Sequence, residues 1–302
     1  MAESFLRRWF GSSPSASPSV EEARAEVDRL IANRPAFLPL LRWLRELLPD
    51  LVPVAAPPVP SLSREQARAK LAEGVPLLRG EQFAVEPREF RRRWKRACEA
   101  LEAVQPDGAA AALAEAVRRG RLDPSALAEV VVTGRPEAVR ARAEALGLDP
   151  GLAATLLRFT LFPLLVPVEA ALAPLRTGAV WDRGYCPTCG SWPLLGEFRG
   201  LDQSRFLRCG LCAAGWEVPR LWCPFCGNRG HDTLQFLHAE GEETKYRALV
   251  CDGCRGYVKM LTTLSALPPL ALMVADAATL HLDLAAAERA YLSPPSKEGS
   301  GG

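Results

Sequence analysis

The sequence predicts an α protein with a small β part: an all-helical N-terminal domain, then two rubredoxin-like or zinc-ribbon metal modules, then a C-terminal helix. Helix start and stop signals recur through the first 178 residues. Eight of the nine cysteines fall between positions 186 and 254, as four Cys-x-x-Cys pairs. With 302 residues and 48% apolar composition, the chain is long enough for a large buried core and about two domains.

Capping residues and prolines mark the helices of the N-terminal half. Ser19 with Glu22 and Ser63 with Gln66 form the capping-box pattern that opens a helix. A proline-rich loop is expected over 49–60, after the second apolar helix. Further helix starts are expected at Pro87, Asp107, Asp123-Pro124, Pro136 and Asp149-Pro150, with stops at Gly120 and Gly147.

The most apolar stretch, Leu152 to Leu175, is expected to be a buried, broken helix. It carries Arg158 and Glu169, and its uncharged run over 159–168 contains two prolines. A membrane span needs about 20 apolar residues. The Arg7-Arg8 pair is not followed by an apolar segment, so no export signal is expected and the cytoplasm is the expected location.

The composition changes after the helical half. Glycine, aromatic and cysteine residues replace the Ala/Leu/Arg/Glu helices, and short strands are expected at 206–207, 216–218 and 246–250. A helix is expected over 275–291. The predicted organisation is a flexible leader over 1–18, a helical domain over 19–178, two tandem four-cysteine modules over 179–258, a C-terminal segment with a helix over 259–292 and a disordered tail over 293–302.

The cysteine pairs predict two tetrathiolate metal sites. A Cys-x-x-Cys turn puts two sulfurs on one side of a tight loop, and a glycine after it accepts the unusual backbone angles. Two facing turns give four ligands in a tetrahedron, which suits zinc or a single iron. The predicted ligands are Cys186 and Cys189 with Cys209 and Cys212, and Cys223 and Cys226 with Cys251 and Cys254.

This pairing follows chain order and leaves 19 and 24 residues between the turns, close to ribbon spacing. A nested pairing, with the outer two turns together around the inner two, is the less favoured arrangement. Disulfides are not expected, because disulfide frameworks belong to small secreted domains.

The chain is not expected to be an enzyme. Both metal sites look closed, whereas catalytic zinc keeps an open position and usually has a His or carboxylate ligand. Neither a glycine-rich phosphate loop nor a Ser/His/Asp constellation is found in the sequence. The three histidines are His231, His238 and His281. No two of them have the spacing of a pair of metal ligands, and each is expected at the surface or on a helix.

Three other features have an ordinary structural explanation. Cys98 lies on one helix face with Phe90, Trp94 and Leu101, which predicts a buried, inert thiol. The basic run over 88–96 predicts a solvated helix face. The alternative is that this run binds an acidic partner. Three tryptophans lie near the Cys-x-x-Cys turns, or knuckles: Trp192, Trp216 and Trp222. They either pack around the metal modules or form a peptide groove.

Charge disfavours a nucleic-acid partner. The chain has 37 Lys+Arg against 35 Asp+Glu. Between 181 and 257 there are nine residues of each sign, so eight thiolates with two divalent ions leave this region with a net charge of −4.

Several motifs resemble the formate dehydrogenase accessory protein family, FdhE. They cover about 184–292 and lie at 184–193, 205–212, Trp216, Arg220, 223–227, 251–259 and 275–283. The resemblance implies a cytoplasmic, chaperone-like assembly factor for respiratory formate dehydrogenase, which binds the molybdenum- or tungsten-dependent catalytic subunit before twin-arginine export. It also implies two rubredoxin-like modules with the eight cysteines as ligands and with iron as a possible metal.

Two other functions remain open from the residues. A rubredoxin-like iron protein would pass electrons to a client, and its absorption would bleach on reduction. A nucleic-acid-binding zinc ribbon is less favoured, because the charge is balanced. The expected partner is the catalytic subunit, without membrane insertion or nucleic acid.

Overall fold

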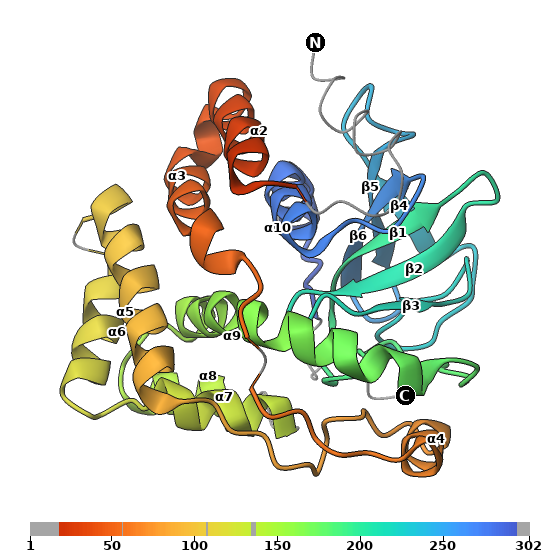
Figure 1. Cartoon of the computed structure of the whole chain (residues 1–302). Helices are drawn as coiled ribbons and strands as arrows, with labels where there is room; N and C mark the ends of the chain where they lie inside the picture. The colour runs from red at the N-terminus through yellow and green to blue at the C-terminus, as the bar shows by residue number, and fades with distance from the viewer. Residues whose placement is uncertain (1–17, 56, 107, 134–136, 295–302) are drawn as a thin grey trace.

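The helical half lies beside a six-stranded sheet (Figure 1). The structure is a computed structural model that describes residues 18–55, 57–106, 108–133 and 137–294. All but the last residue of the predicted leader, the helix starts expected at Asp107 and Pro136, and positions 295–302 of the predicted tail lie outside the described residues.

The helices of the first half begin where the capping signals predict. Ser19 Oγ accepts the Glu22 N–H at 3.1 Å, and Ser63 Oγ accepts the Gln66 N–H at 3.1 Å, so both predicted capping boxes are confirmed. The α-helices are α2 (Val20–Asn33), α3 (Leu38–Leu47), α4 (Arg64–Ala72), α5 (Pro87–Val104), α6 (Ala109–Arg118), α7 (Pro124–Thr133), α8 (Glu137–Ala145) and α9 (Pro150–Leu172). The 3₁₀ turns are Pro35–Phe37, Leu48–Leu51 and Ala173–Arg176.

Helix α9 is continuous, so the expectation of a broken helix is wrong. Pro163 and Pro167 both lie inside it. Pro167 has no N–H, so the Pro163 carbonyl loses its intrahelical donor. The Val54 N–H supplies that donor from the proline-rich loop at 3.1 Å. The loop therefore satisfies a carbonyl that the helix leaves without a donor, and the same hydrogen bond holds the loop against the helix.

Within the described ranges, Pro150–Arg176 is long and apolar enough to span a membrane, and a second candidate arises if the bent pair α10 and α11 counts as one span. Of the apolar window in the first candidate, 56% is buried inside the fold. Leu156, Phe162, Leu165 and Val168 on α9 are completely buried. Burial of this kind is typical of the core helix of a globular domain.

The sheet joins the two predicted modules into one unit. Its strands are β1 (Pro193–Arg199), β2 (Ser204–Cys209), β3 (Gly215–Glu217), β4 (Leu234–Leu237), β5 (Tyr246–Cys251) and β6 (Gly256–Thr263), in the order β3-β2-β1-β6-β5-β4. Each module is a three-stranded antiparallel ribbon, and the parallel pair β1·β6 connects them. The three predicted strands correspond to β2, β3 and β5. Strand β6 crosses position 258, where the second module was expected to end.

The C-terminal helix is bent into two. Helices α10 (Pro269–Ala278) and α11 (Leu280–Ala287) meet at 48°, so the single helix expected over 275–291 is wrong. Thr279 lies at the break, and its hydroxyl donates back to the Ala275 carbonyl at 2.9 Å. Helix α10 lies between α2 and the sheet (Figure 1).

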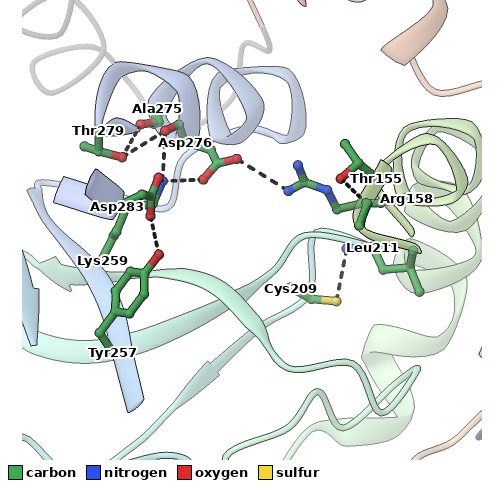
Figure 2. Close-up of polar contacts among 11 residues, drawn as sticks. Thr155, Arg158, Cys209, Leu211, Tyr257, Lys259, Ala275, Asp276, Thr279 and Asp283 are labelled. Carbon is green, nitrogen blue, oxygen red and sulfur yellow. Dashed lines mark hydrogen bonds and ion pairs between the residues drawn. The ribbon is translucent and has the colours of Figure 1, made fainter. Parts of the chain in front are cut away.

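A buried ionic network holds these elements together (Figure 2). Lys259 on β6 contacts Asp276 Oδ1 at 2.6 Å and Asp283 Oδ2 at 2.7 Å. Arg158 on α9 reaches the other Asp276 oxygen at 3.4 Å, and Tyr257 donates to Asp283 at 2.8 Å. Burial alone would lower the pKa of Lys259, but the two carboxylates raise it above its usual value.

Candidate metal centres

The eight predicted cysteines form two groups of four. In each group all the sulfur atoms lie within 4.8 Å of one another. The first centre consists of Cys186, Cys189, Cys209 and Cys212, and the second consists of Cys223, Cys226, Cys251 and Cys254. The turns thus meet in chain order, and the nested arrangement is excluded.

The sulfur spacing fits four ligands around one ion. The closest pairs, at 3.5–3.7 Å, are Cys186–Cys212, Cys189–Cys209, Cys223–Cys254 and Cys226–Cys251. Four sulfurs about 2.3 Å from a zinc ion at tetrahedral angles are about 3.8 Å apart. A disulfide would bring two sulfurs to about 2.05 Å. The donor set suits zinc or iron equally.

Both centres are built on the same local plan. One turn precedes a β-hairpin, and the other begins at the last residue of its second strand, Cys209 on β2 or Cys251 on β5. The glycines after the first turns, Gly190 and Gly227, have φ values of +80° and +77°. Each donates its N–H to the carbonyl of the first cysteine of its turn at 2.9 Å. The glycine therefore closes the knuckle, as the sequence analysis expected.

The first centre is docked against the helical half. The N–H groups of Leu77 and Leu78, in the segment after α4, donate to the carbonyls of Pro187 and Thr188 at 2.9 Å. Those two acceptors are the residues between Cys186 and Cys189. The backbone of the helical half thus holds the first knuckle directly.

A buried carboxylate supports the same knuckle. Thr188 Oγ1 donates to Glu169 on α9, and Arg176 forms an ion pair with the other Glu169 oxygen. Burial raises the pKa of Glu169 to about 7, although Arg176 opposes that shift. In the sequence, Glu169 is only a charge within an apolar stretch, and no spacing signal connects it to the cysteines.

Backbone N–H groups also donate to sulfur in the first centre. Leu211 donates to Cys209 at 3.3 Å (Figure 2), and Thr188 donates to Cys186 at 3.4 Å. Hydrogen bonds of this type favour the thiolate form that a metal requires.

The second centre has a different environment. Cys226 is exposed, whereas the other seven cysteines of the two groups are buried. The Asn228 amide lies 3.5 Å from Cys251 Sγ. The buried Arg205 on β2 donates to the Trp222 carbonyl, just before Cys223, at 2.7 Å. In the sequence, Arg205 is the first residue of the motif over 205–212, but no pattern there predicts a contact with the second centre.

The two centres meet through their knuckles. Gly184 packs so closely on Pro224 that a Cβ at position 184 would lie 1.7 Å from the Pro224 carbonyl oxygen. An aromatic series follows the same boundary: the ring centroids of Tyr185 and Trp192 are 5.9 Å apart, and those of Trp192 and Phe225 are 5.3 Å apart. Trp192 is 38% exposed, and Trp216 and Trp222 are buried.

The remaining candidates lie away from both centres. His281 contacts Glu242 at 2.6 Å, and His231 and His238 are exposed. Cys98 is fully buried on α5, which confirms the predicted burial, and burial raises the pKa of its thiol to about 12, which disfavours the reactive thiolate. Among the described residues, groups of three or more metal-ligating side chains occur only at the two four-cysteine centres.

The basic run on α5 is largely paired within the chain. The ion pairs are Arg91–Asp123, Arg92–Glu89, Arg93–Glu89, Lys95–Glu99 and Arg96–Asp50. This pairing fits a solvated helix face better than a surface for an acidic partner.

Comparison with known proteins points to one family. Residues 185–220, which cover the first centre, match the family model "FdhE, central domain". The chain is 40% identical over 113 residues to a protein FdhE homolog of Stutzerimonas stutzeri, and 30% identical over 153 residues to one of Aquifex aeolicus. These alignments cover 36% and 48% of this chain and 36% and 52% of the relatives. The chain therefore matches about a third to a half of the length of these curated relatives.

A solved structure extends the similarity to the helical half. The crystal structure of the FdhE protein from Pseudomonas aeruginosa has a TM-score of 0.52 and 26% sequence identity to this chain. The alignment covers 95% of this chain and 99% of that one.

Proposed function

We propose that the chain is a member of the FdhE family and an accessory protein for the maturation of formate dehydrogenase, and that it catalyses no reaction of its own. The family-model match over 185–220 and the similarity to FdhE proteins support this proposal. In this proposal it works in the cytoplasm and binds the catalytic subunit of the enzyme before export. The observation that carries the proposal is the pair of four-cysteine centres within an FdhE-like fold.

The eight cysteines of the two centres are the proposed ligands of two ions, zinc or iron. A bound ion supplies folding free energy, because the isolated turns have no such cross-link. The knuckle over 186–189 would then be a firm support for the segment around Leu77 and Leu78. The helical half and the metal modules together would form the docking surface for the client.

Co-purification with the catalytic subunit tests this role. Tagged wild-type chain should capture the subunit. The double variant Cys186→Ser/Cys189→Ser should capture at least about tenfold less, because the first knuckle then lacks the metal that stabilises its fold. Cys98→Ala is the matched control, because it removes a buried thiol outside both centres. Equal capture by wild type and the double variant would contradict a role for the first centre in docking.

Metal analysis of anaerobically purified protein tests the ligand assignment. Wild type should contain about two ions per chain and Cys186→Ser about one, since each centre has its own four sulfurs. A variant that keeps both ions would contradict the assignment.

A rubredoxin-like electron carrier is the second candidate. It is favoured by a donor set that holds iron as well as zinc, and by the exposed position of Cys226. Iron absorption that bleaches on reduction would support it, and a colourless, zinc-loaded protein would exclude it.

A further inference from the structure

The two centres differ in how their ligands meet solvent. In the first centre the four cysteines are between 0% and 4% exposed. In the second centre Cys223, Cys251 and Cys254 are buried, but Cys226 is exposed. Arg229 and Gly230, which follow Cys226 closely in the chain, are exposed as well. Among the eight cysteines of the two centres, Cys226 is therefore the residue that a reagent in solution approaches most easily.

The protein itself accounts for this difference. Two elements cover the first knuckle. One is the segment of Pro76, Leu77 and Leu78, in which Pro76 lies 3.2 Å from the place of a Cβ on Gly190, and the other is helix α9, through Glu169. The second knuckle contacts the first on one side, through Pro224 and Gly184. Its other side, at Cys226, is open.

The buried charges beside the centres also differ. Arg205 is 1% exposed, and within the described part of the chain no carboxylate pairs with it. Its Nη1 donates to the Trp222 carbonyl at 2.7 Å and to the Pro219 carbonyl at 3.3 Å, but Nε and Nη2 find no acceptor among the described residues. A buried cation without a counter-charge is costly. Arg208, which precedes Cys209, is instead paired with the buried Glu197 at 2.7 Å.

A negatively charged metal centre would offset the free-energy cost of burying the unpaired Arg205 cation. Four thiolates around a divalent ion carry a net charge of −2. Arg205 donates to the carbonyl of Trp222, the residue before Cys223, so its positive charge lies beside the backbone that leads into the second centre. The neighbouring cation favours the ionised sulfurs and therefore the retention of an ion.

We propose that the second centre is an exchange centre, with Cys226 as its replaceable ligand and Arg205 as its buried counter-charge, while the first centre is closed and structural. This inference rests on the proposed metal binding and goes beyond the proposed accessory role. A soft donor from a partner, a thiolate above all, fits the Cys226 position because it replaces that sulfur like for like.

Zinc release from the full chain, loaded with two equivalents of zinc, tests the proposal. Excess 4-(2-pyridylazo)resorcinol should remove one equivalent in a fast phase and the second at least about tenfold more slowly, in line with the effect of surroundings on metal affinity. Release of both equivalents in a single phase would overturn the proposal.

Alkylation of the same loaded protein needs no variant. The Cys226 thiolate attacks the methylene carbon of iodoacetamide, a carbon–sulfur bond forms and iodide leaves. Mass spectrometry of early time points should find the adduct on Cys226 before any other cysteine. Equally early modification of Cys189, the corresponding residue of the first centre, would contradict the assignment.

Variants of Arg205 separate its charge from its packing. Arg205→Met should speed the fast phase of zinc release by about tenfold and leave the slow phase unchanged. Arg205→Lys keeps the charge and should restore a rate close to that of wild type. Equal acceleration by both variants would show that Arg205 acts only through packing and would remove it from the proposal.

Discussion

Gly184 is one of the residues at which the two metal modules touch. Its backbone lies against the Pro224 carbonyl, and any side chain there would overlap backbone atoms that cannot rotate away. Gly184 precedes the first knuckle and Pro224 lies inside the third Cys-x-x-Cys turn. A contact of two atoms thus sets how closely the two modules approach.

Substitution of Gly184 by alanine should separate the modules. Overpacking of a rigid contact costs about 1–3 kcal/mol, so Gly184→Ala should lower the urea midpoint of unfolding and the metal content. Gly253→Ala is the matched control, because the nearest atoms to a Cβ at position 253 lie at 3.5 Å. Equal loss in both variants would mean that the knuckles tolerate no substitution at all, whatever the space.

At the residue scale, the sequence predicts a metal site when its ligands recur at short spacing. The cysteine groups could be anticipated because each turn holds two sulfurs and two turns of matching separation follow one another. The supports Glu169 and Arg205 could not, because they reach the centres through tertiary packing from α9 and β2. In the sequence, Glu169 is an isolated charge in an apolar helix, and only the fold brings it into contact with Thr188.

At the scale of elements, strand β6 and helices α10 and α11 depend on one buried cation. Lys259 is 3% exposed and neutralises both Asp276 and Asp283. Burial alone would raise the pKa of Asp276, but Lys259 and Arg158 hold it below its usual value. These two cations therefore favour the ionised form of Asp276, whereas burial raises the pKa of Asp283 above its usual value although Lys259 opposes that shift.

Replacement of Lys259 by methionine should therefore be severe. Removal of one partner of a buried ion pair costs about 3–5 kcal/mol, since the remaining charge is left unpaired. Urea denaturation should show this loss for Lys259→Met. Lys95→Met, at a lysine whose side chain is 73% exposed, should change stability by less than about 1 kcal/mol. A similar small change at Lys259 would show that the network contributes little.

Element prediction succeeds where the signal is local. Capping boxes at Ser19 and Ser63 depend on residues three positions apart, and both helices begin there. Strand β1 begins with a proline and contains Gly196, which weakens any strand pattern, so its place comes from its neighbours β2 and β6. The bend at Thr279 is also tertiary, because α10 packs on α2 while α11 packs on the sheet.

At the scale of the whole molecule, Glu242 connects three regions of the chain. It lies in the loop between β4 and β5 and contacts Arg34, at the end of α2, at 2.9 Å, and His281, on α11, at 2.6 Å. The hydrogen bond with His281, supported by the charge of Arg34, holds the pKa of Glu242 below its usual value. A carboxyl with a depressed pKa stabilises the fold above its ordinary pKa and loses that effect as pH falls through the depressed value.

Glu242→Gln should therefore lower stability in a pH-dependent way. At pH 7 the expected loss is about 1 kcal/mol, discounted because the group is partly exposed and screened by solvent. The gap in unfolding free energy between wild type and variant should narrow as pH falls from about 5 to about 3. Glu240→Gln, at an exposed neighbour, serves as the control. A gap that stays constant across this range would show that ionisation of Glu242 contributes nothing.

The parallel pairing of β1 with β6 has a consequence for biosynthesis. Strand β1 is complete at Arg199, but its partner ends at Thr263. During translation the first ribbon must wait, with one edge unpaired, until 64 more residues have left the ribosome. At common elongation rates of about 5–20 residues per second, the nascent chain thus has an unpaired β1 edge for several seconds.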